Sequence, residues 1–239
     1  MATRLDLDLD LFRRQLAAIE ARAAECAGDR PAPRIVIVSK YLSSDDCRTL
    51  RGEGFGPLGE NRAQDLEQKV DPGEDRDGWH FIGHLQRNKI GLVLPRVSCL
   101  HSLDSERLAR SVDRWVDEHG SAPLRCLVQV NIAGETQKGG LAPFEAKEKL
   151  PAWIEEFGSL SIAGLMTMAP LGSAEEARPV FAALRDLRDG IRAELPDDSA
   201  EAFSELSMGM SGDYEVAAEE GATLLRIGRI LYTENSGND

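Results

Sequence analysis

Short apolar runs alternate with longer amphipathic segments along most of the chain. Arg34–Ser39 (RIVIVS) carries four consecutive β-branched residues, and a strand without a polar face is buried on both sides. Similar runs follow at 57–59, 79–83, 97–103, 124–131, 160–168, 205–208 and 223–227. The segments between them have helical spacing or helix-capping residues. The pattern predicts about eight strands with helices between them.

The regular alternation favours one architecture over another. Short buried strands that alternate with helices form parallel sheets with right-handed crossovers. About eight such units favour a closed α/β barrel, the (β/α)8 or TIM-type fold, over an open, doubly wound sheet. No composition break or long Pro/Ser linker divides the sequence. We therefore expect a single domain over residues 1–239, with an N-terminal helix at about 5–27 and a disordered tail at about 233–239.

Composition and charge narrow the functional classes. The chain has 239 residues, 42% of them hydrophobic, which is enough for one large core. Its formal net charge of −13 argues against nucleic-acid and anionic-membrane binding, because both require a basic surface. The four cysteines form no C-x-x-C pair and no zinc-ligand spacing, so no metal site is expected. Neither a signal peptide nor a membrane-spanning run is present, and we expect a soluble cytoplasmic protein.

Polar residues collect where the predicted strands end, which is where barrels of this type carry their sites. Lys40 follows the first strand, and Arg226 lies on the last. The loop SMGMSGD at 207–213 precedes a helix, and its amides, with those of the turn after the last strand, suit a phosphate. The alternative is that Lys40 is a solvated residue and that the glycines only allow the chain to turn.

These features would come together in a closed barrel, because strands seven and eight would adjoin strand one. A phosphorylated aldehyde that joins Lys40 through an imine would span the lysine and the phosphate loop. Pyridoxal 5′-phosphate (PLP) is such a molecule, and it needs a lysine and a partner for its pyridine nitrogen. If that partner is Arg226, its permanent charge would keep the ring nitrogen unprotonated and disfavour full carbanion chemistry.

The order of motifs resembles a known family. The segments IVIVSK, GENRAQD, WHFIGHLQRNK, HSLDS, VQVNIAGETQKGGL, IAGLMTM and LSMGMSGDYEVAAEEGATLLRIG occur in this order between about residues 34 and 231. In this they resemble the pyridoxal phosphate homeostasis protein family, of the proline synthase co-transcribed homologue type. This family is similar to the N-terminal barrel domain of alanine racemase. The resemblance implies a monomer with PLP as its cofactor.

The resemblance also implies roles for individual residues, which are Lys40, Asn61, Ser207, Met208, Arg226, Ile227 and Gly228. Lys40 would form the Schiff base, Arg226 would meet the pyridine nitrogen, and Asn61 would lie beneath the cofactor. Ser207 and Met208, with the amides of Ile227 and Gly228, would hold the phosphate.

Other matched positions have less defined roles. His84, Gln86, Asn88 and Lys89 match the third-strand motif. Most relatives carry proline where His84 stands, so a packed or hydrogen-bonded histidine is the simpler interpretation. Lys138 is either a second anchoring lysine or a solvated loop residue.

Three functions remain open at this stage. The first is a protein that holds PLP as a lysine Schiff base, serves intracellular PLP homeostasis and delivers PLP to PLP-dependent apoenzymes. The second is a PLP-dependent amino-acid racemase or related enzyme that uses Lys40 as its sole base. The third is a barrel that binds another phosphorylated metabolite without an imine. We favour the first, which is not an enzyme.

A second catalytic base is not expected. Alanine racemase takes its second base, a tyrosine, from a separate β-domain, and this chain ends just past the eighth strand. Tyr41 is next to the lysine, but if the first strand continues to it, the alternation of side chains turns it away from the pocket. Two-base racemisation therefore lacks support in the sequence.

Overall fold

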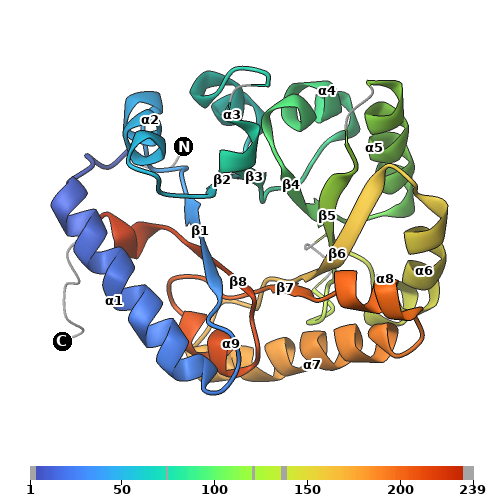
Figure 1. Cartoon of the computed structure of the whole chain (residues 1–239). Coiled ribbons are helices and arrows are strands. Elements are labelled where there is room, and N and C mark those ends of the chain that lie inside the picture. The colour runs from blue at the N-terminus through green and yellow to red at the C-terminus, as the bar shows by residue number, and fades with distance from the viewer. Residues whose placement is uncertain (1–3, 74, 120–121, 136–138, 234–239) are drawn as a thin grey trace.

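The computed structural model describes residues 4–73, 75–119, 122–135 and 139–233. Eight parallel strands close into a barrel in chain order, with β8 paired to β1 (Figure 1). Their bounds are β1 Arg34–Val38, β2 Leu58–Glu60, β3 Trp79–Phe81, β4 Cys99–Leu103, β5 Leu124–Gln129, β6 Leu160–Met166, β7 Glu205–Ser207 and β8 Leu224–Ile227. The closed barrel predicted from the alternating pattern is confirmed, and the open sheet is excluded.

Helices cover the outside of this ring of strands (Figure 1). The α-helices are α1 Leu9–Ala27, α2 Ser44–Gly52, α3 Ala63–Lys69, α4 Ile90–Val93, α5 Glu106–Glu118, α6 Pro143–Glu156, α7 Ala174–Arg192, α8 Asp197–Ala202 and α9 Tyr214–Glu219. Short 3-10 helices lie at Arg76–Gly78 (η1), Arg87–Lys89 (η2), Leu94–Arg96 (η3) and Arg229–Leu231 (η4). Within the described ranges, no helix combines the length and apolar character that a membrane crossing requires.

The N-terminal helix begins at Leu9 rather than at about residue 5. The side chain of Asp8 accepts a hydrogen bond from the amide of Leu11 at 2.9 Å and so caps the first turn. The helix buries Phe12 and Leu16, and it packs against α9 and η4 on the outside of the barrel. Residues 234–239, which make up most of the expected tail, lie outside the described residues.

Side chains of the barrel separate into two cores, because alternate residues of a strand face opposite sides of the sheet. The larger core lies between the strands and the helices. The smaller core comprises Val36, Cys99, Leu127, Ala163, Met166 and Leu224. Several buried polar residues of the strands also lie inside the ring, among them His101, Ser207 and Arg226. The interior of the barrel is therefore partly polar, and this polar part leads to the candidate site.

Candidate functional site

A pocket of about 410 Å³ opens among the segments that follow the strands. It is lined by Val38, Lys40, Tyr41, Asn61, Ile82, Met168, Met210, Ser211, Gly212, Arg226, Gly228 and Arg229. The structure thus brings together four of the residues expected from the sequence, which are Lys40, Asn61, Arg226 and Gly228. A pocket of this size accommodates a small cofactor.

Lys40 is half-buried and lies in a turn directly after β1. The turn is closed by a hydrogen bond of 2.9 Å from the amide of Leu42 to the carbonyl of Ser39. The ammonium nitrogen of Lys40 lies 5.0 Å from the centre of the Tyr41 ring, within range of a cation–π contact.

The first strand does not continue to Tyr41, so the condition under which this side chain would face away from the pocket is not met. Tyr41 lines the pocket together with Lys40. The strand ends at Val38, and the chain then turns, so the alternation of a strand no longer determines where the Tyr41 side chain points.

A buried ion pair supports the wall behind Lys40. The Nζ atom of Lys69 lies 2.5 Å from Oε2 of Glu60 and donates to the carbonyl of Ser39 at 2.8 Å. The two charged side chains are 6% and 0% exposed. The other carboxylate oxygen of Glu60 accepts a hydrogen bond of 2.7 Å from the amide of Asn61. The pair therefore ties the segment that carries Lys40 to the segment that carries Asn61.

The side chain of Asn61 has an unsatisfied oxygen. Its Oδ1 atom is buried and has no hydrogen-bond partner among the described residues. Gly83, after β3, permits the close approach of this segment, because a Cβ atom there would lie 2.0 Å from the carbonyl oxygen of Asn61. A buried side-chain amide oxygen without a donor is costly, and Asn61 lines the pocket, so its amide is a candidate contact for a ligand.

Arg226 reaches the pocket from inside the barrel. It is 4% exposed, and its guanidinium donates to Oγ of Ser207 at 2.7 Å and to the carbonyl of Thr167 at 2.9 Å. Burial lowers the pKa of Arg226 to about 10, and the nearby carboxylate of Asp213 opposes this shift. The side chain is therefore still a cation at neutral pH, held in place by two neutral acceptors.

Ser207, Met208 and Ile227 are completely buried and do not line the pocket. The hydroxyl of Ser207 contacts Arg226, and the amide of Met208 donates to the carbonyl of Leu224 at 3.2 Å. Their assignment to the phosphate therefore stays a prediction.

Other residues near the end of the chain present polar groups to the pocket. The Gly228 amide lies 3.5 Å from Oγ of Ser211, and Gly212 and Arg229 are beside them. The resemblance assigned Ser207 of the motif SMGMSGD to the phosphate, whereas Ser211 and Gly212 of the same motif line the pocket.

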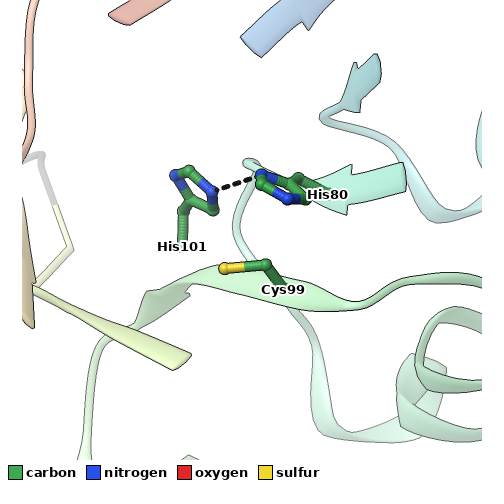
Figure 2. A group of neighbouring side chains, drawn as sticks. All are labelled: His80, Cys99 and His101. Atoms are coloured by element: carbon green, nitrogen blue, oxygen red, sulfur yellow. Dashed lines mark hydrogen bonds between the residues drawn. The ribbon is translucent and has the colours of Figure 1, made fainter. Parts of the chain in front are cut away.

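Two histidines extend the chain of hydrogen bonds that begins at Arg226 and Ser207 further into the barrel. Nδ1 of His101 lies 2.9 Å from Oγ of Ser207. Its Nε2 lies 3.0 Å from Nδ1 of His80, and Figure 2 shows this contact between the two rings. Burial lowers the pKa of His101 and lowers that of His80 to about 3, so both rings are neutral near pH 7. Sequence analysis did not single out either ring.

Arg226, Ser207, His101 and His80 form a polar column whose hydrogen bonds all run in one direction, from Arg226 to His80. Arginine can only donate, so Ser207 accepts from Arg226, and the serine proton is then free to be donated to Nδ1 of His101. His101 in turn donates from Nε2 to Nδ1 of His80. The opposite direction would leave the Ser207 hydroxyl proton without an acceptor among these contacts.

Comparisons with known proteins identify relatives over nearly the whole chain, although no protein-family model matches it. The pyridoxal phosphate homeostasis protein of Aquifex aeolicus is 38% identical over 216 residues, which are 89% of this chain and 92% of that protein. The protein of that name from Deinococcus radiodurans is 40% identical over 218 residues, which are 89% of this chain and 93% of that protein. This chain belongs to the pyridoxal phosphate homeostasis protein family.

Solved structures agree with this assignment. The chain resembles PipY of Synechococcus elongatus with PLP bound, with a TM-score of 0.74 and 31% identity over 90% of this chain and 100% of PipY. It also resembles alanine racemase of Clostridium difficile, with a TM-score of 0.68 and 15% identity over 100% of this chain and 60% of that protein. The second likeness concerns the fold alone, and it confirms the expected similarity to the barrel of alanine racemase.

The third-strand motif of this family member surrounds a second, smaller hollow of about 180 Å³. Its lining includes His84, Gln86 and Lys89, and it shares Asn61 with the larger pocket. The exposed ring of His84 lies 2.9 Å from Oδ2 of Asp104. His84 is thus a hydrogen-bonded residue next to the main pocket and does not line it, whereas Lys138 lies outside the described residues.

Proposed function

We propose that this protein binds PLP in the pocket of about 410 Å³, holds it as a Schiff base with Lys40, and takes part in intracellular PLP homeostasis and delivery. It would act as a single-domain monomer that passes PLP to PLP-dependent apoenzymes. The observation that carries the proposal is the convergence of an amine, a buried guanidinium and an unpartnered amide oxygen on one pocket. Membership of a family in which PipY has been solved with PLP bound supports the choice of ligand.

Each residue has a separate role in this proposal. Bound PLP supplies an aldehyde that reacts with an amine and a ring that withdraws electrons. Lys40 provides the amine, and Oδ1 of Asn61 provides an acceptor that is unoccupied within the part of the chain that the structure describes. Ser211, Arg229 and the amide of Gly228 provide donors for the phosphate.

Arg226 is the partner proposed for the pyridine nitrogen. Its guanidinium remains a donor held by Ser207 and Thr167, and it therefore keeps that nitrogen unprotonated. An unprotonated ring withdraws electrons weakly, so we propose that the protein is not an enzyme.

The position of Tyr41 does not change this preference for a binding protein. Two-base racemisation needs two groups on opposite faces of the substrate. Since Nζ of Lys40 lies 5.0 Å from the centre of the Tyr41 ring, the two groups are neighbours. The alternative is a racemase that uses Lys40 alone. Incubation of amino acids with the PLP-loaded protein in heavy water should give no α-proton exchange beyond that of free PLP, and exchange at enzymatic rates would establish the racemase instead.

Borohydride reduction tests the Schiff base. Wild-type protein incubated with PLP should show a visible absorption band that reduction removes, with the added mass on the peptide that contains Lys40. The Lys40→Ala variant should lose both, because a stable imine needs the amine. Lys147→Ala, which removes an exposed lysine of α6, should behave as wild type. A band and an adduct that persist in Lys40→Ala would show that another lysine carries PLP.

Transfer to an apoenzyme tests delivery. Loaded protein is mixed with the apo form of a PLP-dependent enzyme in the presence of a phosphatase that destroys free PLP. Delivery predicts that the apoenzyme still becomes active, whereas an equal amount of free PLP does not activate it. Equal loss of activation in the two samples would mean that the protein only stores PLP.

A further inference from the structure

Three side chains meet inside the barrel in a cluster that the proposed function does not use as a ligand-binding site. His80 comes from β3, and Cys99 and His101 come from β4 (Figure 2). Cys99 and His101 are two residues apart on one strand, so both face the interior. Their potential ligand atoms all lie within 4.8 Å of one another. The exposed fractions are 9% for His80, 1% for Cys99 and 0% for His101.

We propose that this cluster is a binding site for one soft, monovalent metal ion of the Cu(I) type. The ligands are Nδ1 of His80, Sγ of Cys99 and Nε2 of His101. Thiolate sulfur prefers soft ions such as Cu(I), and imidazole nitrogen is a common ligand for copper and zinc. The site needs no PLP and is independent of the proposed function.

The charges around the cluster favour a monovalent ion. Arg34, Arg125 and Glu205 act electrostatically on Cys99, and Oε1 of Glu205 lies 2.5 Å from Arg34 and 2.7 Å from Arg125. This group carries a net charge of about +1, and the cation Arg226 acts on His101. A Cys99 thiolate and a Cu(I) ion together are neutral, whereas a Zn²⁺ ion would leave a further buried positive charge, which is costly.

The number of ligands points the same way. The cluster offers three ligand atoms within the described part of the chain. Structural zinc sites use four protein ligands, and three suffice for trigonal copper sites. Two nitrogens bound to one ion at about 2 Å each are roughly 3.5 Å apart, so His80 and His101 need to separate by only a few tenths of an ångström from their present 3.0 Å.

The outer contacts of His101 suit a metal ligand. A ligating histidine usually donates from its other ring nitrogen to a fixed partner, and Nδ1 of His101 lies 2.9 Å from Oγ of Ser207. When the ion binds, the His101 proton moves from Nε2 to Nδ1, and the Cys99 thiol loses its proton to solvent. The oxygen of Ser207 then accepts from both Arg226 and His101 through its two lone pairs, and the serine proton gives up its contact with Nδ1. One positive charge enters and one leaves, and no oxidant or reductant takes part.

A competition titration tests the proposal. Full-length protein with the Cys26→Ala substitution, which removes the half-buried cysteine outside the cluster, is titrated with Cu(I) without oxygen against the chelator bicinchoninate. We expect one equivalent of Cu(I) to be retained. Cys99→Ala should weaken binding by more than the roughly 10–100-fold that loss of an outer-shell partner costs. The matched control is Cys126→Ala, which removes a fully buried thiol of β5 from the larger core and should not change the affinity.

X-ray absorption of the Cu(I)-loaded protein gives a second measurement. It does not require any substituted protein to fold. The proposal predicts one sulfur and two nitrogen ligands. It would be overturned by any other ligand set, by failure to retain Cu(I) against bicinchoninate, or by equal affinities of Cys99→Ala and Cys126→Ala. Tighter retention of Zn²⁺ than of Cu(I) would overturn the choice of a monovalent ion. In any of these cases the cluster is a hydrogen-bonded histidine pair packed beside a thiol.

Discussion

At the scale of single residues, the strongest indication of a ligand is an atom without a partner. Oδ1 of Asn61 is buried and accepts no hydrogen bond from any residue in the described ranges. The polar groups of Arg226, by contrast, have two neutral acceptors, and Lys40 lies over an aromatic ring. The protein thus carries an unfavourable contact at Asn61 that a bound molecule with a donor would relieve.

This contrast predicts opposite effects of Asn61→Ala on stability and on binding. Removal of an unsatisfied oxygen should leave the free energy of unfolding without PLP unchanged or slightly higher. The affinity for PLP should fall roughly 5–30-fold, since about 1–2 kcal/mol of hydrogen bonding is lost. Urea unfolding of the apoprotein and a PLP titration followed by absorbance measure the two quantities. A variant that loses stability but binds PLP as tightly as wild type would contradict the assignment of Asn61 to the pocket.

At the scale of elements, the segments at the ends of the strands position the residues of the candidate site. The loops after β1 and β2 are joined by the buried pair of Lys69 and Glu60, through the Ser39 carbonyl and the Asn61 amide. Lys69 lies at the end of α3, so this helix, the first strand and the second strand share one polar contact. The pair therefore holds the segment of Lys40 next to that of Asn61.

Lys69→Met should destabilise the protein by about 3–5 kcal/mol, because it leaves the Glu60 carboxylate buried and unpaired. Lys149→Met is a matched control, since Lys149 is paired with Glu145 of the same helix at 3.4 Å and is 36% exposed. That control should change the free energy of unfolding by no more than about 0.5 kcal/mol. Urea denaturation of both variants gives the comparison, and equal losses would mean that the buried pair has no special role.

The sequence predicted which segments form strands better than it predicted where each strand ends. Eight apolar runs became eight strands, because burial on both faces requires continuous apolar residues. The end of β1 at Val38 has no such signal, so the sequence left the orientation of Tyr41 dependent on how far this strand continues. Likewise, nothing in the motif SMGMSGD distinguishes Ser207, which contacts Arg226 from below, from Ser211, which lines the pocket. These differences depend on contacts between strands far apart in the sequence.

At the scale of the whole molecule, closure of the barrel brings four strands together around one polar column. The column runs from Arg226 on β8 through Ser207 on β7 and His101 on β4 to His80 on β3. The sequence predicted a closed barrel, but not which inward residues would meet across it. Burial keeps both histidines neutral, so the stability of the folded barrel depends on neither ring binding a second proton.

The free energy of unfolding should therefore fall as the pH falls below about 6.5, the pKa of an unfolded histidine. Burial lowers the pKa of His80 to about 3 and also lowers that of His101, so below pH 6.5 the unfolded chain binds more protons than the folded one. The stability due to each neutral ring is complete above pH 6.5, and the loss approaches about 1.4 kcal/mol per pH unit for each ring as the pH falls toward the lowered pKa. Urea unfolding between pH 7 and pH 5 should show a shallower slope for His80→Gln than for wild type. His119→Gln, which removes an exposed ring at the end of α5, should keep the wild-type slope. The same slope in His80→Gln and wild type would mean that His80 is protonated within the folded barrel.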